Sequence, residues 1–237
     1  MVLAAGLGTR LRPLTEDRPK ALVELNGRTL LEITLARLRE FGIRDVIVNT
    51  HAFARQIAEY LSNNKNFGMN VAISPEDELL DTGGGLKRAS YFFADTPGPF
   101  LLHNVDVISD FDFAAMLRLH RERNALTTLA VQRRNNSRPL LFSESDLMCG
   151  YRTPDGEVWA RGQCDAHQLA FAGIHIISPR IFALLPAQEK FSIIPAYLAL
   201  AAAGERIVAY RQDDAYWADL GTPQALQQAA ARENPLH

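Results

Sequence analysis

Short apolar runs rich in β-branched residues alternate with amphipathic segments through the first half of the chain. The apolar runs lie at residues 2–5, 45–49, 69–74, 99–105 and 126–132, and the amphipathic segments lie at 29–41, 52–62, 84–92 and 111–123. This order is typical of parallel strands joined by crossover helices. The pattern therefore predicts an α/β protein with a Rossmann-like central sheet, mixed but mostly parallel, that is flanked by helices.

The pattern changes after residue 133, where a polar stretch over 133–139 interrupts the alternation. Short strands are expected near 139–143, 147–152 and 156–160, followed by a buried strand at 170–178, a helix at 193–203, a strand at 206–211 and a helix that begins at Thr222-Pro223. The short strands favour antiparallel hairpins. We therefore predict one domain over 1–237, with a first half at 1–133 and a second half at 134–237 that carries a small antiparallel insertion.

Composition narrows the functional classes. The 237 residues are 47% hydrophobic, enough for a substantial core, and the net charge of −2 provides no general attraction for nucleic acid. The longest apolar run is too short to cross a membrane, so no membrane partner is expected. The two isolated cysteines, Cys149 and Cys164, indicate reduced thiols and a cytoplasmic protein.

A glycine loop with a basic tail opens the chain. Gly6 and Gly8 allow a tight turn that exposes backbone N–H groups, and the cations Arg10, Arg12 and Lys20 indicate a polyphosphate ligand. The residues expected to contact this ligand are Leu3, Ala4, Ala5, Gly6, Gly8, Thr9 and Arg10. The strand before Gly6 is short for the centre of a sheet, which leaves open whether the natural chain begins upstream of Met1.

Two common glycine motifs do not fit this loop. A dinucleotide-binding fingerprint needs glycine at position 11, which is Leu11, and a P-loop needs Gly-Lys-Ser/Thr where this chain has Gly8-Thr9-Arg10. The remaining pattern, an apolar run, Gly-x-Gly-x-Arg and then Pro19-Lys20, resembles the signature of the sugar-1-phosphate nucleotidylyltransferases. The loop at 82–85 and the segment 171–174 also resemble the short branch that contains N-acetylmuramate 1-phosphate uridylyltransferases and mannose-1-phosphate guanylyltransferases.

Two acidic residues follow apolar segments. Asp106 ends the run 100–105, and Asp219 lies in the segment 216–222. Ligands of open α/β sheets bind beyond the carboxyl ends of strands, although Asp106 taken alone could equally be a turn residue. The resemblance implies that Asp106 and Asp219 hold a catalytic Mg²⁺, and two carboxylates suit that hard cation.

A third segment, over 74–85, corresponds to the part of the family that binds the nucleobase. Glu76 could accept hydrogen bonds from uracil or guanine, and backbone at Gly83 or Gly84 could complete the contact. The glycines could instead merely accommodate a helix. This segment does not choose the base.

The resemblance implies that the half at 1–133 binds nucleotide and the half at 134–237 binds sugar, and it also implies the remaining residue roles. Lys20 would contact the α-phosphate and the incoming sugar phosphate, Arg10 would contact the β- and γ-phosphates, and Asn104 would contact the nucleotide. Three residues of uncertain alignment are sugar-binding candidates, namely Gly150, Gly173 and Thr222. The family's second lysine is absent, because the corresponding stretch, 166–169, reads Ala-His-Gln-Leu.

The leading hypothesis is a Mg²⁺-dependent transfer of a nucleotidyl group from a nucleoside triphosphate to a sugar 1-phosphate, which gives an NDP-sugar, expected to be a cell-envelope sugar, and pyrophosphate. UTP is favoured and GTP is second. The alternatives are a phosphocholine cytidylyltransferase, a glycosyltransferase that uses Asn104-Val105-Asp106 as its metal motif, and a non-catalytic nucleotide-sugar-binding regulatory module. Base, sugar, and the choice between monomer and homodimer stay open.

Overall fold

The computed structural model describes residues 1–232 and contains two compact units. Unit 1 comprises Met1–Leu80, His103–Asp110 and Ala215–His237, and unit 2 comprises Asp81–Leu102 and Phe111–Asp214. These units differ from the halves predicted at residue 133, because unit 2 takes residues from both sides of that position. The prediction of a single domain stays a prediction. Residues 233–237, at the end of the predicted sugar-binding half, lie outside the described residues.

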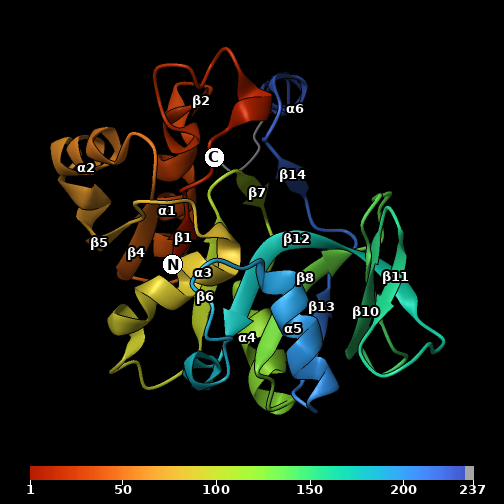
Figure 1. Ribbon diagram of the computed structural model, residues 1–237. Helices are drawn as coiled ribbons and strands as arrows, with labels where there is room; N and C mark the ends of the chain where they lie inside the picture. The colour runs from red at the N-terminus through yellow and green to blue at the C-terminus, as the bar shows by residue number, and fades with distance from the viewer. Residues whose placement is uncertain (233–237) are drawn as a thin grey trace. The chain divides into compact units, whose positions relative to one another are not determined.

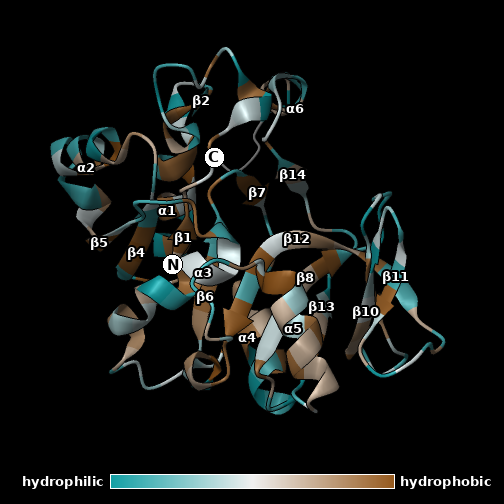
Figure 2. Ribbon diagram, in the orientation of Figure 1, coloured by the Kyte–Doolittle hydropathy of each residue, from teal (hydrophilic) through white to brown (hydrophobic). Residues whose placement is uncertain are grey.

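Unit 1 is built on a short parallel sheet. Strand β1 (Val2–Leu3) pairs in parallel with β4 (Asp45–Thr50) and with the end of β6 (Phe100–Asn104), and β4 also pairs in parallel with β5 (Asn70–Pro75). The middle of β4 is fully buried, and Figure 2 shows it as strongly hydrophobic. Strands covered on both faces carry such continuous apolar runs, so the predicted parallel arrangement is confirmed.

Helices and two small antiparallel strand pairs complete unit 1 (Figure 1). The helices are α1 (Leu30–Glu40), α2 (Ala54–Asn63) and α6 (Pro223–Ala230), and the antiparallel pairs are β2 (Glu24–Leu25) with β3 (Arg28–Thr29) and β7 (Val107–Ser109) with β14 (Trp217–Asp219). Helix α1 begins after Thr29, whose hydroxyl accepts a hydrogen bond from Glu32 N at 3.1 Å. Its leucine stripe is buried as the spacing predicts.

Unit 2 is organised around the long strand β12 (His167–Ile177). It pairs in antiparallel fashion with β8 (Thr127–Gln132) and β9 (Leu140–Phe142), and β8 pairs in parallel with β13 (Ile207–Arg211). Strands β9, β10 (Met148–Thr153) and β11 (Gly156–Trp159) form the predicted antiparallel insertion. Helices α4 (Phe113–Glu122) and α5 (Ile193–Ala202) pack beside these strands (Figure 1).

Helix α3 and the short strands β2, β3, β7 and β14 differ from the sequence prediction. Helix α3 spans Asp81–Arg88 rather than 84–92, so the three glycines lie inside the helix and not in a loop before it. Strand β14 was not predicted, because a strand of three residues is too short to show an alternation. Within residues 1–232, no helix has the length and apolar character needed to span a membrane.

Candidate functional site

The glycine loop lies in unit 1, directly after β1. Gly8 has φ +63, a left-handed conformation, and it precedes a short 3-10 helix over Thr9–Leu11. Its carbonyl accepts hydrogen bonds from Leu11 N and Thr15 Oγ1, both at 2.8 Å. In the part of the chain that the structure describes, the N–H groups of Gly6, Leu7 and Gly8 have no acceptor. This loop therefore offers donors to an anion, as the sequence predicts.

Lys20 joins the loop to the metal-site candidate Asp106. Its ammonium Nζ lies 2.8 Å from Asp106 Oδ2, and both side chains are largely buried, at 15% and 9% exposure. A Cβ placed on Gly6 would lie 3.5 Å from the same Nζ. The predicted lysine, loop and carboxylate thus lie together in unit 1.

The backbone brings Asp106 and Asp219 to the same end of the antiparallel β7–β14 pair. In the β7–β14 ladder, Asp219 lies opposite Val107, the residue after Asp106. Leu220 N donates to Asp106 O at 2.8 Å, and Gly221 N donates to Asp219 Oδ1 at 2.8 Å. The two acids, distant in sequence, are therefore placed by a ladder that the sequence pattern did not predict.

The side chain of Arg10 also lies at this end of the β7–β14 pair. A Cβ built on Gly221 would lie 2.7 Å from Arg10 Nη2 and 2.7 Å from Asp219 Oδ1. Only a residue without a side chain leaves room for this approach. Gly221 lies in the segment 216–222, and the sequence alone gave no reason to assign it a role.

The donor set of this site fits Mg²⁺. Among residues 1–232, no group of three or more histidine, cysteine or acidic side chains could hold a metal ion. Mg²⁺, however, is commonly held by one or two carboxylates, with substrate phosphates completing its octahedral shell. Asp106 and Asp219 supply two carboxylates in the same unit as the glycine loop, and this donor set fits that preference.

A hydrogen-bonded chain links the loop to Glu76. Ala4 N donates to Asn49 Oδ1 at 2.7 Å, Asn49 Nδ2 donates to Glu76 Oε1 at 2.7 Å, and Leu80 N donates to Glu76 Oε2 at 3.0 Å. Asn49 was missed by the sequence analysis. The signal was its place at the carboxyl end of a predicted strand, where only acidic residues had been sought.

The buried carboxylate of Glu76 is thus occupied by groups of the protein itself. Its side chain is 4% exposed, and both oxygens accept hydrogen bonds from unit 1. Contact between Glu76 and a nucleobase stays a prediction.

The glycines of α3 make a close approach to an aromatic ring within unit 2. A Cβ on Gly83 would lie 2.3 Å from Phe191 Cε2, and the N–H groups of Gly83 and Gly84 donate to Phe191 O at 3.0 and 3.2 Å. These glycines therefore have a packing role, and their base-binding role stays a prediction.

The other predicted contacts have identifiable local roles. Asn104 lies beside Leu3 in the β1–β6 register. Thr222 caps α6 by accepting from Ala225 N at 3.2 Å, a Cβ on Gly150 would lie 2.7 Å from Val158 O, and Gly173 has φ +76 at an irregularity in the β12–β8 ladder. Sugar binding by Gly150, Gly173 and Thr222 stays a prediction.

His103, which precedes Asn104, is neutral. Burial lowers its pKa to about 4, and its Nδ1 donates to Asn104 O at 2.8 Å. It therefore brings no positive charge to the site near neutral pH.

Comparison with known proteins finds similarity to nucleotidyl transferases. The nucleotidyl transferase family model matches residues 1–140. The chain is 34% identical to an N-acetylmuramate alpha-1-phosphate uridylyltransferase of Caulobacter vibrioides, over 98% of this chain and 95% of the relative. It is 29% identical to a mannose-1-phosphate guanyltransferase of Yarrowia lipolytica, over 94% of this chain and 60% of the relative.

A solved structure shares the fold. HddC from Yersinia pseudotuberculosis, complexed with GMP-PN, has a TM-score of 0.76 and 22% identity, over 97% of this chain and 96% of that one. Fold, motifs and relatives define the class as sugar-1-phosphate nucleotidyltransferases, which the opening loop predicts. The chain belongs to the nucleotidyl transferase family.

Proposed function

We propose that this chain transfers a uridylyl group from UTP to a sugar 1-phosphate, with release of pyrophosphate. The observation that carries the proposal is the position of Lys20, whose Nζ lies 2.8 Å from Asp106 Oδ2 and against Gly6 of a loop with unpaired N–H groups. The uridylyltransferase relative from Caulobacter vibrioides, which this chain matches over nearly its whole length, supports UTP as the donor.

The chemistry follows from these groups. A phosphate oxygen of the sugar phosphate attacks the α-phosphorus in line, and the bond from that phosphorus to the bridging oxygen of pyrophosphate breaks. No protein nucleophile is needed, so positioning and charge stabilisation dominate. Lys20 contacts the α-phosphate and the incoming phosphate, while Arg10 and the loop N–H groups contact the β- and γ-phosphates.

Asp106 and Asp219 would hold the metal ion. When bound there, Mg²⁺ neutralises phosphate charge that builds up during transfer. Removal of divalent ions with a chelator is therefore expected to abolish turnover, and Mg²⁺ is expected to restore it. Full turnover after exhaustive chelation would remove the metal from the proposal.

The acceptor is proposed to be N-acetylmuramate 1-phosphate, the substrate named for the relative from Caulobacter vibrioides. Glu76, Gly83, Gly84 and Asn104 are the residues proposed to bind the base and nucleoside. GTP with mannose 1-phosphate is the second candidate, because a relative that matches 94% of this chain is named for that reaction.

A pyrophosphate-release screen tests the proposal. UTP, GTP, CTP and dTTP are each combined with a panel of sugar 1-phosphates and with phosphocholine. UTP with N-acetylmuramate 1-phosphate is expected to release pyrophosphate fastest. Pyrophosphate release from CTP with phosphocholine, consumption of a UDP-sugar supplied in a separate reaction, or tight binding without turnover would each support one of the three alternative functions instead.

A further inference from the structure

Unit 2 contains a cavity of about 460 Å³ that no residue of the proposed nucleotide or metal site lines. Pockets of this volume commonly hold small organic molecules. Its wall combines apolar side chains, Leu140, Phe171 and Ile194, with polar ones that include Asn136 and Ser192. The size and the mixed lining suit a substituted monosaccharide.

The cavity carries one uncompensated positive charge. Two arginines line it, and Arg152 is neutralised by Glu157, with 2.7 Å between Nη2 and Oε1. Within residues 1–232, the guanidinium of Arg138 has no hydrogen-bond or ion-pair partner, and no acidic side chain lines the cavity. An anion is therefore the ligand that this lining favours.

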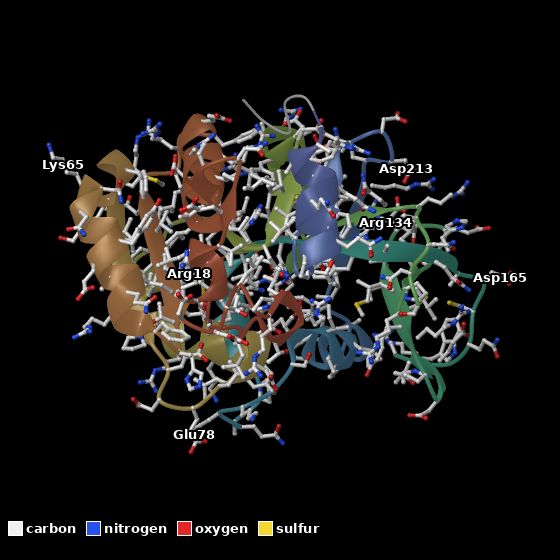
Figure 3. All side chains as sticks on the ribbon, turned by 90° about the horizontal axis from the view of Figure 1, so that it is seen from above. Arg18, Lys65, Glu78, Arg134, Asp165 and Asp213 are labelled. Atoms are coloured by element: carbon white, nitrogen blue, oxygen red, sulfur yellow. The ribbon has the colours of Figure 1, made fainter. Side chains whose placement is uncertain are left out.

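The walls of the cavity are held in place by hydrogen bonds. Arg134, labelled in Figure 3, donates from Nη2 to Phe171 O at 2.5 Å, and Asn136 Oδ1 accepts from Arg138 N at 3.0 Å. Directly after the lining residue Ser192, Ile193 N donates to Thr82 Oγ1 at 3.1 Å. A site that is fixed before binding loses less entropy when its ligand enters.

We infer that this cavity binds the acceptor sugar through a carboxylate on the sugar, and that Arg138 selects for it. The inference rests on the proposed function. One guanidinium matches one carboxylate in charge and in its paired donor geometry. N-acetylmuramate carries such a carboxylate on a lactyl ether, and N-acetylglucosamine is the same ring without it.

The test compares two sugars in three proteins. N-acetylmuramate 1-phosphate and N-acetylglucosamine 1-phosphate are titrated calorimetrically, and kcat/KM is measured with saturating UTP. The proteins are the natural chain, Arg138→Gln and Arg121→Gln. Arg121 is an exposed arginine of α4 in the same unit that does not line the cavity, so it is the matched control.

Arg138→Gln is expected to weaken binding of the acidic sugar by about 10- to 100-fold, through Kd and KM rather than kcat, because it removes a charge-assisted contact. Binding of the neutral sugar is expected to change less than about twofold, and Arg121→Gln should alter neither. Equal losses for both sugars would mean that Arg138 contacts the phosphate, and this result, or no loss, overturns the inference. Discrimination in binding without pyrophosphate release would keep the inference and reject the proposed function.

Discussion

Two glycine segments of this chain look alike in sequence and serve opposite purposes. In unit 1, Gly8 has φ +63, and the N–H groups of Gly6 and Gly8 have no acceptor among the described residues. In unit 2, Gly83 and Gly84 lie inside α3, and their N–H groups donate to Phe191 O. The first segment needs glycine for backbone conformation and access, and the second needs it for space.

The difference shows what a glycine motif can and cannot indicate. A loop glycine flanked by cations predicts a ligand, because the unpaired backbone donors of such a turn are satisfied when an anion binds. A glycine run that begins a helix is ambiguous. A packed aromatic ring leaves no space for a Cβ, and a bound nucleobase would have the same effect. Residues outside each glycine segment decide whether its glycines serve a ligand or internal packing. These residues are Lys20 for the first segment and Phe191 for the second.

Lys20→Gln should give the largest effect. The amide can still donate to Asp106, but the charge beside the loop is lost, and removal of a preorganised group that stabilises transition-state charge costs about 100- to 1,000-fold in kcat. Pyrophosphate release measures this loss. Lys65→Gln, on an exposed lysine of the same unit (Figure 3), is the control and should stay near the natural rate. A Lys20→Gln rate within about threefold of the natural rate would contradict the catalytic role of the loop.

Gly83→Ala should mainly reduce stability. Its Cβ would lie 2.3 Å from the Phe191 ring and 2.8 Å from Phe191 O, and overpacking of this kind costs about 1–3 kcal/mol of unfolding free energy. Urea unfolding measures the change. Gly6→Ala, whose nearest neighbour would be Lys20 Nζ at 3.5 Å, should cost less than about 1 kcal/mol while it lowers activity.

A second substitution separates packing from base binding at Gly83. Phe191→Leu removes ring atoms that the new methyl group would meet, so the double variant should be less destabilised than the two single losses together. Recovered stability with a raised KM for UTP would show that Gly83 also contacts the base. Recovered stability with an unchanged KM would leave Gly83 as a packing residue only.

Local pattern was sufficient for most of the fold. Continuous β-branched runs predicted the buried strands of unit 1, and the leucine spacing predicted α1, because burial and helical periodicity are local properties of sequence. The start of α3 was wrong by three residues, because Phe191, which stabilises that turn of glycines, lies more than a hundred positions away. The three-residue strand β14 has no periodicity to reveal it, yet it places Asp219.

The site was predictable by residue type and not by contact. The loop, Lys20 and Asp106 were identified from sequence, and the structure brings them together. The role of Asn49 depends on a chain of hydrogen bonds through Ala4 and Glu76, which only three-dimensional proximity defines. The proposed role of Arg138 likewise depends on its lining the cavity and on its guanidinium having no partner among residues 1–232. Both are properties of the folded chain.

Two buried histidines with lowered pKa values, His103 in unit 1 and His120 in unit 2, should make stability fall in mild acid. Burial lowers the pKa of His103 in unit 1 and of His120 in unit 2 to about 4. Below about pH 6.5 the unfolded chain takes up these protons while the folded chain does not, so the full stability present above pH 6.5 is lost progressively towards pH 4. The slope should approach about 1.4 kcal/mol per pH unit for each histidine.

The variant His120→Gln measures how much of this slope comes from His120. His120 lies between Thr128 Oγ1 at 2.9 Å and Ser178 Oγ at 3.0 Å, and glutamine can keep hydrogen bonds there without titrating. Urea unfolding at pH 7 and pH 5 should show a smaller decrease in the variant than in the natural chain. An identical decrease in both would mean that His120 does not contribute.

The smallest effect concerns Lys87, which ties the packing glycines to the segment before α5. Its Nζ donates to the carbonyls of Pro186, Ala187 and Gln188 at 2.7, 2.8 and 3.1 Å. Because two of these contacts are exposed, Lys87→Met should cost only about 1 kcal/mol of unfolding free energy. Amide hydrogen exchange is the sharper readout, since local loosening should speed exchange at Gly83 and Gly84.

The same exchange measurement tests the contrast between the two glycine segments directly. The amides of Gly6 and Gly8 have no acceptor among residues 1–232. They should therefore exchange fast in the natural chain and in Lys87→Met alike. Their exchange should slow only when UTP is added. The amides of Gly83 and Gly84 should be slow without nucleotide, because Phe191 O already accepts from them. Slow exchange at Gly6 and Gly8 without UTP would mean that the loop is closed by the protein itself, and its role as a phosphate cradle would then have to be abandoned.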